Sequence, residues 1–140
     1  MPNVPASLAI VCADFHQEIA EVMIAAAEDE AKTAGLETIS VTRVPGSLEA
    51  PLVIDQLLEN GAGAVVALGF IEKGETLHGE VMGHVVYKSL IDLQLKHKKP
   101  IGLGIIGPGA TPEQAEVRKE TAARGAVKAV IRSYQTLGES

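Results

Sequence analysis

The sequence predicts an α/β fold, a three-layer α/β/α sandwich around a four-stranded parallel sheet in the flavodoxin-like order 2-1-3-4. Short runs of Val, Ile, Leu and Ala alternate with longer segments of helical periodicity, which is typical of a parallel sheet. No repeat, linker or low-complexity segment interrupts this alternation. The chain is also long enough to bury a core of its own, so we expect residues 1–140 to form a single domain.

Four strands and four helices are expected along the chain. The strands are residues 7–13, 38–42, 64–69 and 101–106. The helices are residues 14–35, 48–60, 76–97 and 112 onward.

The first helix is expected to begin at a capping box, in which Asp14 is the cap and Gln17 completes the box. Apolar residues then recur at helical spacing until Gly35. The second strand alternates polar and apolar residues, as strands do. The second helix is expected to have Ser47 as its cap and Gly61 as its stop.

The third helix, capped by Thr76, has two apolar stripes. The first stripe lies on the same side of the helix as His78 and is expected to face the sheet. His78 should therefore point into the crevice at the carboxyl ends of the strands. The members of this stripe are Met82, Val85, Val86, Ser89 and Leu93. The second is Leu77, Val81, Ile91 and Leu95. Two stripes are more than one face of a monomer's helix needs, so the pattern favours an oligomer.

The last strand–helix unit contains a glycine-rich loop, expected at residues 107–110. Thr111 and Gln114 form a second capping box, with Pro112 at the first helical position. Because residues 119–121 interrupt the apolar spacing, we expect a kink or a break there.

The composition restricts the possible partners. A net charge of −6 argues against nucleic acid and acidic membranes. No apolar run is long enough to span a membrane and no signal peptide is recognisable, so we expect a cytoplasmic enzyme. The mean hydropathy of +0.19 is high for a small monomer and again indicates surfaces buried between subunits. The single cysteine, Cys12, is expected in the core, and no residues have metal-ligand spacing, so no metal is expected.

Polar and glycine-bearing segments gather where the predicted strands end, which is where ligands bind in such sheets. Gly74, Glu75 and Thr76 offer backbone N–H groups and a hydroxyl to an anion at a helix start. His78 follows in the first turn, where the helix dipole favours a neutral ring that can accept a proton. We therefore favour His78 over the other histidines, His16, His84 and His97, as the catalytic candidate.

Three more side chains at this edge each have two interpretations. Phe15 either stacks on a planar heterocycle or plugs the start of its helix. Glu49 either accepts hydrogen bonds from a polyol or stabilises the helix dipole. Arg118 either binds a dianionic group or is a solvated surface arginine.

Taken together, four motifs in order resemble the lumazine synthase family along essentially the whole chain. They are Asp14-Phe15-His16, Val44-Pro45-Gly46-Ser47-Leu48-Glu49-Ala50-Pro51, Ala67-Leu68-Gly69 with Gly74-Glu75-Thr76-Leu77-His78, and Glu113-Gln114-Ala115-Glu116-Val117-Arg118. The loop Gly107-Pro108-Gly109 resembles that of the archaeal branch.

The resemblance implies condensation of 5-amino-6-(ribitylamino)uracil with 3,4-dihydroxy-2-butanone 4-phosphate in riboflavin biosynthesis, without metal or organic cofactor. It implies that Phe15 stacks on the pyrimidine and that Ser47, Leu48 and Glu49 line its ring and ribityl chain. Gly74, Glu75, Thr76 and Arg118 are then the residues that hold the phosphorylated substrate, and His78 is the one that shuttles protons. The family's site lies between subunits of a homopentamer, so Leu103 and Arg118 are expected from the adjacent chain.

Four positions depart from the family pattern. His16 stands where the family usually has asparagine, and Leu48 and Leu103 stand where bacterial members often have phenylalanine. Arg124, a further candidate for substrate binding, aligns with a position that is often lysine; arginine positions an anion but is a poor proton carrier. The segment between Arg118 and Arg124 is short, which leaves the assembly of pentamers into a shell open.

Two alternatives remain at this point. One is an archaeal-type riboflavin synthase, which needs no phosphate site and is therefore disfavoured by Gly74–His78 and Arg118. The other is a non-catalytic flavin- or lumazine-binding protein or a shell-forming paralogue, which the departures at His16, Leu48 and Leu103 leave open.

Overall fold

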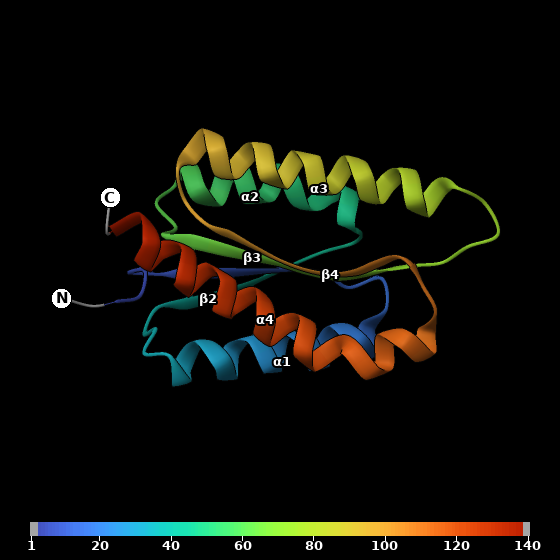
Figure 1. Cartoon of the computed structure of the whole chain (residues 1–140), viewed down its shortest axis with the longest axis horizontal. Coiled ribbons are helices and arrows are strands. Elements are labelled where there is room, and N and C mark those ends of the chain that lie inside the picture. The colour runs from blue at the N-terminus through green and yellow to red at the C-terminus, as the bar shows by residue number, and fades with distance from the viewer. Residues whose placement is uncertain (1–2, 139–140) are drawn as a thin grey trace.

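The computed structural model describes residues 3–138 as four strands, four α-helices and one short 3₁₀ turn (Figure 1). In chain order they are β1 (Leu8–Ala13), α1 (Gln17–Thr33), β2 (Ile39–Val44), η1 (Ser47–Glu49), α2 (Ala50–Glu59), β3 (Ala64–Glu72), α3 (His78–His97), β4 (Ile101–Ala110) and α4 (Pro112–Gly138). The strands are all parallel and lie in the order β2-β1-β3-β4. The predicted fold class and strand order are confirmed.

The sheet is the middle of three layers, with α1 and α4 on one face and α2 and α3 on the other (Figure 1). Side chains of the central strands alternate between the two faces. Ile10 and Val66 belong to the core under α1 and α4, and Val11 and Ala67 to the core under α2 and α3. Because both faces are covered, β1 and residues 64–71 of β3 are apolar, which explains why the sequence indicated these strands.

The predicted cap of the first helix is wrong. Helix α1 begins at Gln17, and His16 is the residue before it, without a side-chain capping bond. Asp14 still belongs to the sheet edge, because its N–H donates to the carbonyl of Val44 at 2.9 Å. Its carboxylate lies 3.8 Å from the guanidinium of Arg43 on β2.

The second helix also begins differently from the prediction. Residues 47–49 form the 3₁₀ turn η1, and α2 starts only at Ala50. Ser47 makes no capping hydrogen bond, and its side chain is buried beside Gly69 of β3. The stop at Gly61 agrees with the prediction, since this glycine has a φ of +105°.

Strands β3 and β4 are longer than predicted, and the expected loop at residues 107–110 is the end of β4. Pairing continues past an irregularity to Glu72 and Ala110, and the N–H of Lys73 donates to the carbonyl of Ala110 at 2.8 Å. Gly107 has a φ of +95°, and a Cβ there would collide with the carbonyl oxygen of Ile71. The backbones therefore approach closely where only glycine fits.

Helix α4 begins at the predicted capping box. The N–H of Gln114 donates to the hydroxyl of Thr111 at 3.2 Å, and the N–H of Thr111 donates to the side-chain carbonyl of Gln114 at 2.9 Å. The expected break at residues 119–121 is wrong, because α4 is continuous to Gly138. Its buried stripe runs through the small residues Ala115 and Ala123, so the polar residues 119–121 do not interrupt it.

Helix α3 buries one face against the sheet and leaves a second apolar stripe exposed. Its inward face is centred on Gly83, Val86 and Leu90, so Val85, predicted to face the sheet, is exposed. The second stripe is uncovered in the single chain: Leu77, Val81, Ile91 and Leu95 all expose between 44% and 70% of their surface.

Candidate active site

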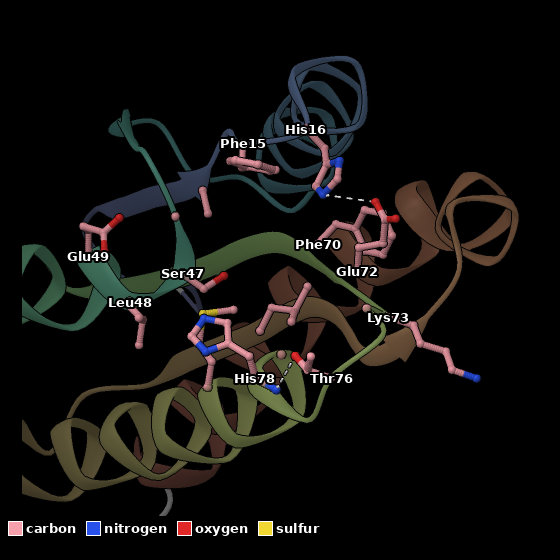
Figure 2. A pocket seen from close by; sticks show the side chains of 16 residues that line it. Phe15, His16, Ser47, Leu48, Glu49, Phe70, Glu72, Lys73, Thr76 and His78 are labelled. Atoms are coloured by element: carbon pink, nitrogen blue, oxygen red, sulfur yellow. Dashed lines mark hydrogen bonds and ion pairs between the residues drawn. The ribbon is translucent and has the colours of Figure 1, made fainter.

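A pocket of about 520 Å³ opens beyond the carboxyl ends of β1 and β3, between η1 and the start of α3. This is the edge of the sheet at which the sequence predicted a ligand site. Seven of the predicted site residues line it: Phe15, Ser47, Leu48, Glu49, Gly74, Thr76 and His78 (Figure 2). The fold thus brings three segments that are far apart in the sequence around one cavity.

The side of the pocket formed by Gly74, Thr76 and His78 is suited to an anion. Helix α3 begins at His78, and the preceding residue, Leu77, has no capping side chain. Thr76 takes part of the capping role predicted for it, because its hydroxyl accepts the N–H of His78 at 3.3 Å. The start of a helix carries partial positive charge and backbone N–H groups, which favour a phosphate or carboxylate. Glu75 borders a neighbouring hollow of about 340 Å³ together with Gly74 and Thr76.

The opposite wall is suited to a planar ring. Phe15 exposes 80% of its surface at the pocket, so its ring face is accessible to a ligand. Leu48 is half exposed beside the buried Ser47, and Glu49 brings a carboxylate to the same wall (Figure 2). An aromatic face next to a hydroxyl and a carboxylate can bind a heterocycle that carries polar substituents.

The structure adds pocket residues that the sequence analysis did not favour. His16 lines the cavity, with its Nε2 atom 3.7 Å from Oε1 of Glu72 and its ring centroid 4.6 Å from that of Phe70. The sequence analysis ended the third strand at residue 69, so Phe70 and Glu72 were not placed at the carboxyl end of the sheet. The uninterrupted apolar run through Phe70 and Ile71 was the available signal. Lys73 lines the pocket as well, but its side chain points away from the other residues (Figure 2).

Three predicted site residues lie outside this pocket in the single chain. Leu103 packs against the core beneath α2 and α3. Arg118 borders a separate hollow beside residues 105–110, where its guanidinium donates to the carbonyl of Gln114 at 3.4 Å. Arg124 donates to a carboxylate oxygen of Asp29 at 2.8 Å. This bond raises the pKa of the Arg124 guanidinium further above its ordinary value.

Within residues 3–138, the structure shows neither a metal-binding cluster nor a reactive cysteine. Among residues 3–138, no three His, Cys, Asp or Glu side chains are arranged to hold a metal ion. Cys12 is fully buried, as predicted, and burial raises the pKa of its thiol to about 12, so it is no nucleophile near neutral pH. No helix in the described part of the chain is long and apolar enough to cross a membrane.

Comparison with known proteins identifies relatives along almost the whole chain. The family model for 6,7-dimethyl-8-ribityllumazine synthase matches residues 5–137. The chain is 43% identical to the 6,7-dimethyl-8-ribityllumazine synthase of Staphylothermus marinus, over 91% of the chain and 85% of the relative. It is also 43% identical to the 6,7-dimethyl-8-ribityllumazine synthase of Metallosphaera sedula, over 89% of the chain and 83% of the relative. With that of Aeropyrum pernix the identity is 39%, over 94% of both chains.

Proposed function

The chain belongs to the 6,7-dimethyl-8-ribityllumazine synthase family, and we propose that the pocket between η1 and α3 is its active site. The chain is a transferase of riboflavin biosynthesis, which condenses 5-amino-6-(ribitylamino)uracil with 3,4-dihydroxy-2-butanone 4-phosphate and releases phosphate and water. The observation that supports the site most directly is the gathering of Phe15, Ser47–Glu49 and Gly74–His78 around one cavity.

We assign the two sides of the pocket to the two substrates. Phe15 stacks on the pyrimidine, while Ser47, Leu48 and Glu49 contact its polar edge and the ribityl chain. Gly74, Glu75 and Thr76 bind the phosphorylated ketone at the start of α3, where the helix dipole favours the dianion. His78 lines the same pocket, next to the residues assigned to the phosphorylated ketone. In this proposal it moves protons during imine formation and phosphate release.

The proposed site is completed by a second copy of the chain in a homopentamer. The exposed apolar stripe of α3 supports such an assembly, because a monomer gains nothing from leaving Leu77, Val81 and Leu95 in water. In this proposal Leu103 and Arg118 reach the pocket of the neighbouring subunit, where Arg118 provides the cation for the phosphate. Arg124 then acts as a substrate-binding residue only if it leaves its carboxylate partners on α1, Asp29 and Glu30. We also propose a cytoplasmic location, which suits the free thiol of Cys12.

The reaction is tested by mixing the purified protein with both substrates and following lumazine fluorescence together with phosphate release. We expect both signals to appear together and to depend on both substrates. If lumazine or riboflavin binds but no product forms above the uncatalysed background, the chain is a binding protein and the proposed function is wrong. The Arg118→Ala variant should require a higher concentration of the phosphorylated ketone; an unchanged requirement would remove the role assigned to Arg118.

The role of His78 is tested by the His78→Ala variant. We expect kcat to fall by ~10²-fold or less, because general acid–base groups contribute about this much and the two substrates react with each other unaided. The Lys32→Ala variant is the control, since Lys32 is exposed on α1, outside the pocket and away from the apolar stripe of α3. Equal activity of the two variants would contradict the assignment.

A further inference from the structure

A tyrosine hydroxyl on α3 contacts the end of β4. The half-buried Tyr87 donates from its Oη atom toward two carbonyl oxygens, that of Ile105 at 2.9 Å and that of Gly107 at 2.7 Å. A hydroxyl has one proton, so the two carbonyls share it. Burial raises the pKa of the Tyr87 hydroxyl, which therefore keeps this proton near neutral pH. Tyr87 thus fixes residues 105–107 from the side of the helix.

The same face of α3 makes a second contact with this segment. Gly83 lies one helical turn before Tyr87, and a Cβ atom on it would come within 2.7 Å of the ring of Pro108. The proline ring therefore packs where only glycine leaves room. Gly83 and Tyr87 together hold the part of β4 in which pairing with β3 becomes irregular, between Ile106 and Ala110.

The held segment leads directly to an arginine of the proposed site. Only Thr111 separates β4 from α4, and it caps that helix together with Gln114. Arg118 follows one turn later, and it borders a hollow of about 340 Å³ that residues 105–110 also line. Because a helix transmits a displacement as a rigid element, a shift of residues 107–110 also shifts the first turns of α4 and with them Arg118.

We propose that Tyr87 is a positioning residue for the reaction: its hydroxyl fixes the end of β4 and, through it, the place from which Arg118 reaches the phosphorylated ketone. This inference rests on the proposed function, in which Arg118 binds the phosphate in the pocket of the neighbouring subunit. Tyr87 does not line the pocket of its own chain, so it acts through Arg118 and not on the substrate. A guanidinium is sensitive to such placement, because its N–H groups must meet the phosphate oxygens in a fixed geometry.

The first test is Tyr87→Phe, which removes only the hydroxyl. We expect the KM of the phosphorylated ketone to rise about two- to tenfold, the range that one neutral hydrogen bond provides, and the KM of the uracil substrate to stay within about twofold. Tyr134→Phe is the matched control, since Tyr134 is the other tyrosine of the chain and borders a hollow beside the amino ends of β3 and β4. It should change neither KM. An unchanged KM for the ketone, or an equal rise for both substrates, would overturn the proposal.

The route through Arg118 is tested by a double variant. If Tyr87 acts by positioning Arg118, the Tyr87→Phe/Arg118→Ala protein has a ketone KM no higher than that of Arg118→Ala alone. If Tyr87 acts independently of Arg118, the two increases multiply and the proposal is wrong. We expect light scattering to give the wild-type mass for Tyr87→Phe. A lower mass would place the effect in assembly and would also overturn the proposal.

Gly83→Ala tests the same segment with the hydroxyl retained, and it serves if Tyr87→Phe folds poorly. Alanine favours the helix, but its Cβ atom would displace the ring of Pro108. We expect the same selective rise in the KM of the ketone. Amide hydrogen exchange at residues 107–111 should become faster in both variants. Unchanged exchange in both would show that these two contacts do not hold the segment.

The outcomes separate this inference from the proposed function. A wild-type protein that forms no lumazine refutes the function itself. If Arg118→Ala keeps the wild-type KM for the ketone, the role of Arg118 is refuted and that of Tyr87 with it. If Arg118→Ala raises this KM while Tyr87→Phe and Gly83→Ala do not, only the positioning role of Tyr87 is refuted.

Discussion

In the proposed site, recognition of the heterocycle depends on the exposed ring of Phe15. Its surface is 80% exposed, so the ring contributes little to the core, and in our proposal the heterocycle covers it. Its ring packs against that of His16, with 5.1 Å between the ring centroids and 77° between the ring planes. Ser47 and Glu49 on the adjoining wall supply the polar contacts that a stacking ring cannot.

We expect Phe15→Ala to raise the KM of the uracil substrate about three- to tenfold, the range that an aromatic contact provides, and to leave the free energy of unfolding nearly unchanged. Steady-state kinetics and urea unfolding measure the two effects. Leu52→Ala is the control, because Leu52 is 77% exposed on α2 outside the pocket and should change neither quantity. A KM equal to that of the wild type would show that Phe15 does not stack on the substrate.

At the scale of elements, α2 and α3 are joined by a polar contact at the end away from the pocket. His97 lies near the end of α3 with only 8% of its side chain exposed, and its Nε2 atom is 2.6 Å from Oδ1 of Asp55 on α2. Lys96 donates to the same oxygen at 3.0 Å. The sequence analysis placed His97 below His78 as a catalytic candidate, and its contacts explain it as a residue that holds the two helices together.

Asp55 should make this contact depend on pH. The hydrogen bonds from His97 and Lys96 lower the pKa of Asp55 below the ordinary value of 3.8. Because the folded state has the lower pKa, the ionised carboxylate stabilises the fold above pH 3.8, and this contribution is lost as pH falls through the folded pKa. We expect Asp55→Asn to lower the free energy of unfolding at pH 7 and the difference from wild type to shrink in acid.

Urea unfolding at several pH values measures this difference. Glu21→Gln is the control, since Glu21 pairs with Arg43 at 2.7 Å where its side chain is 65% exposed, and such exposed pairs contribute little. A difference between Asp55→Asn and wild type that stays constant down to pH 3 would contradict the ionic role of Asp55.

At the scale of the whole molecule, the single chain is an incomplete enzyme in our proposal. One helix, α3, begins at the pocket with His78 and carries the uncovered stripe of Leu77, Val81, Ile91 and Leu95 along its length. In our proposal, catalysis and assembly therefore depend on the same helix. The proposed interface along α3 places a neighbouring chain close to the anion-binding end of the pocket, where the proposal assigns Arg118 to the phosphate.

We expect Val81→Glu to prevent assembly and, with it, most activity, because a carboxylate buried in an apolar interface is left unpaired. Light scattering on the purified protein gives the mass of the assembly, and the lumazine assay gives the activity. Lys32→Glu on the exposed side of α1 is the control and should keep the wild-type mass. A Val81→Glu protein with the wild-type mass would show that the interface lies elsewhere.

The sequence by itself determined the fold class, the strand order, the second capping box and the segments that meet at the pocket. These follow from local physics: continuous apolar runs must be buried on both faces, and parallel strands end at one edge. It misjudged features that depend on neighbours in space. The pairing of β3 with β4 extends both strands past the predicted ends, and Asp14, predicted as a helix cap, instead bonds to Val44 at the end of β2.

Only the tertiary structure decided which side chains line the pocket. It placed Glu72 against His16, because the extended end of β3 carries Glu72 across to the start of α1. It left Leu103, Arg118 and Arg124 outside the pocket of their own chain, which no spacing along the sequence indicates. Local patterns fix which residues form strands and helices. Contacts between side chains that are distant in the sequence are determined only by how the strands and helices pack.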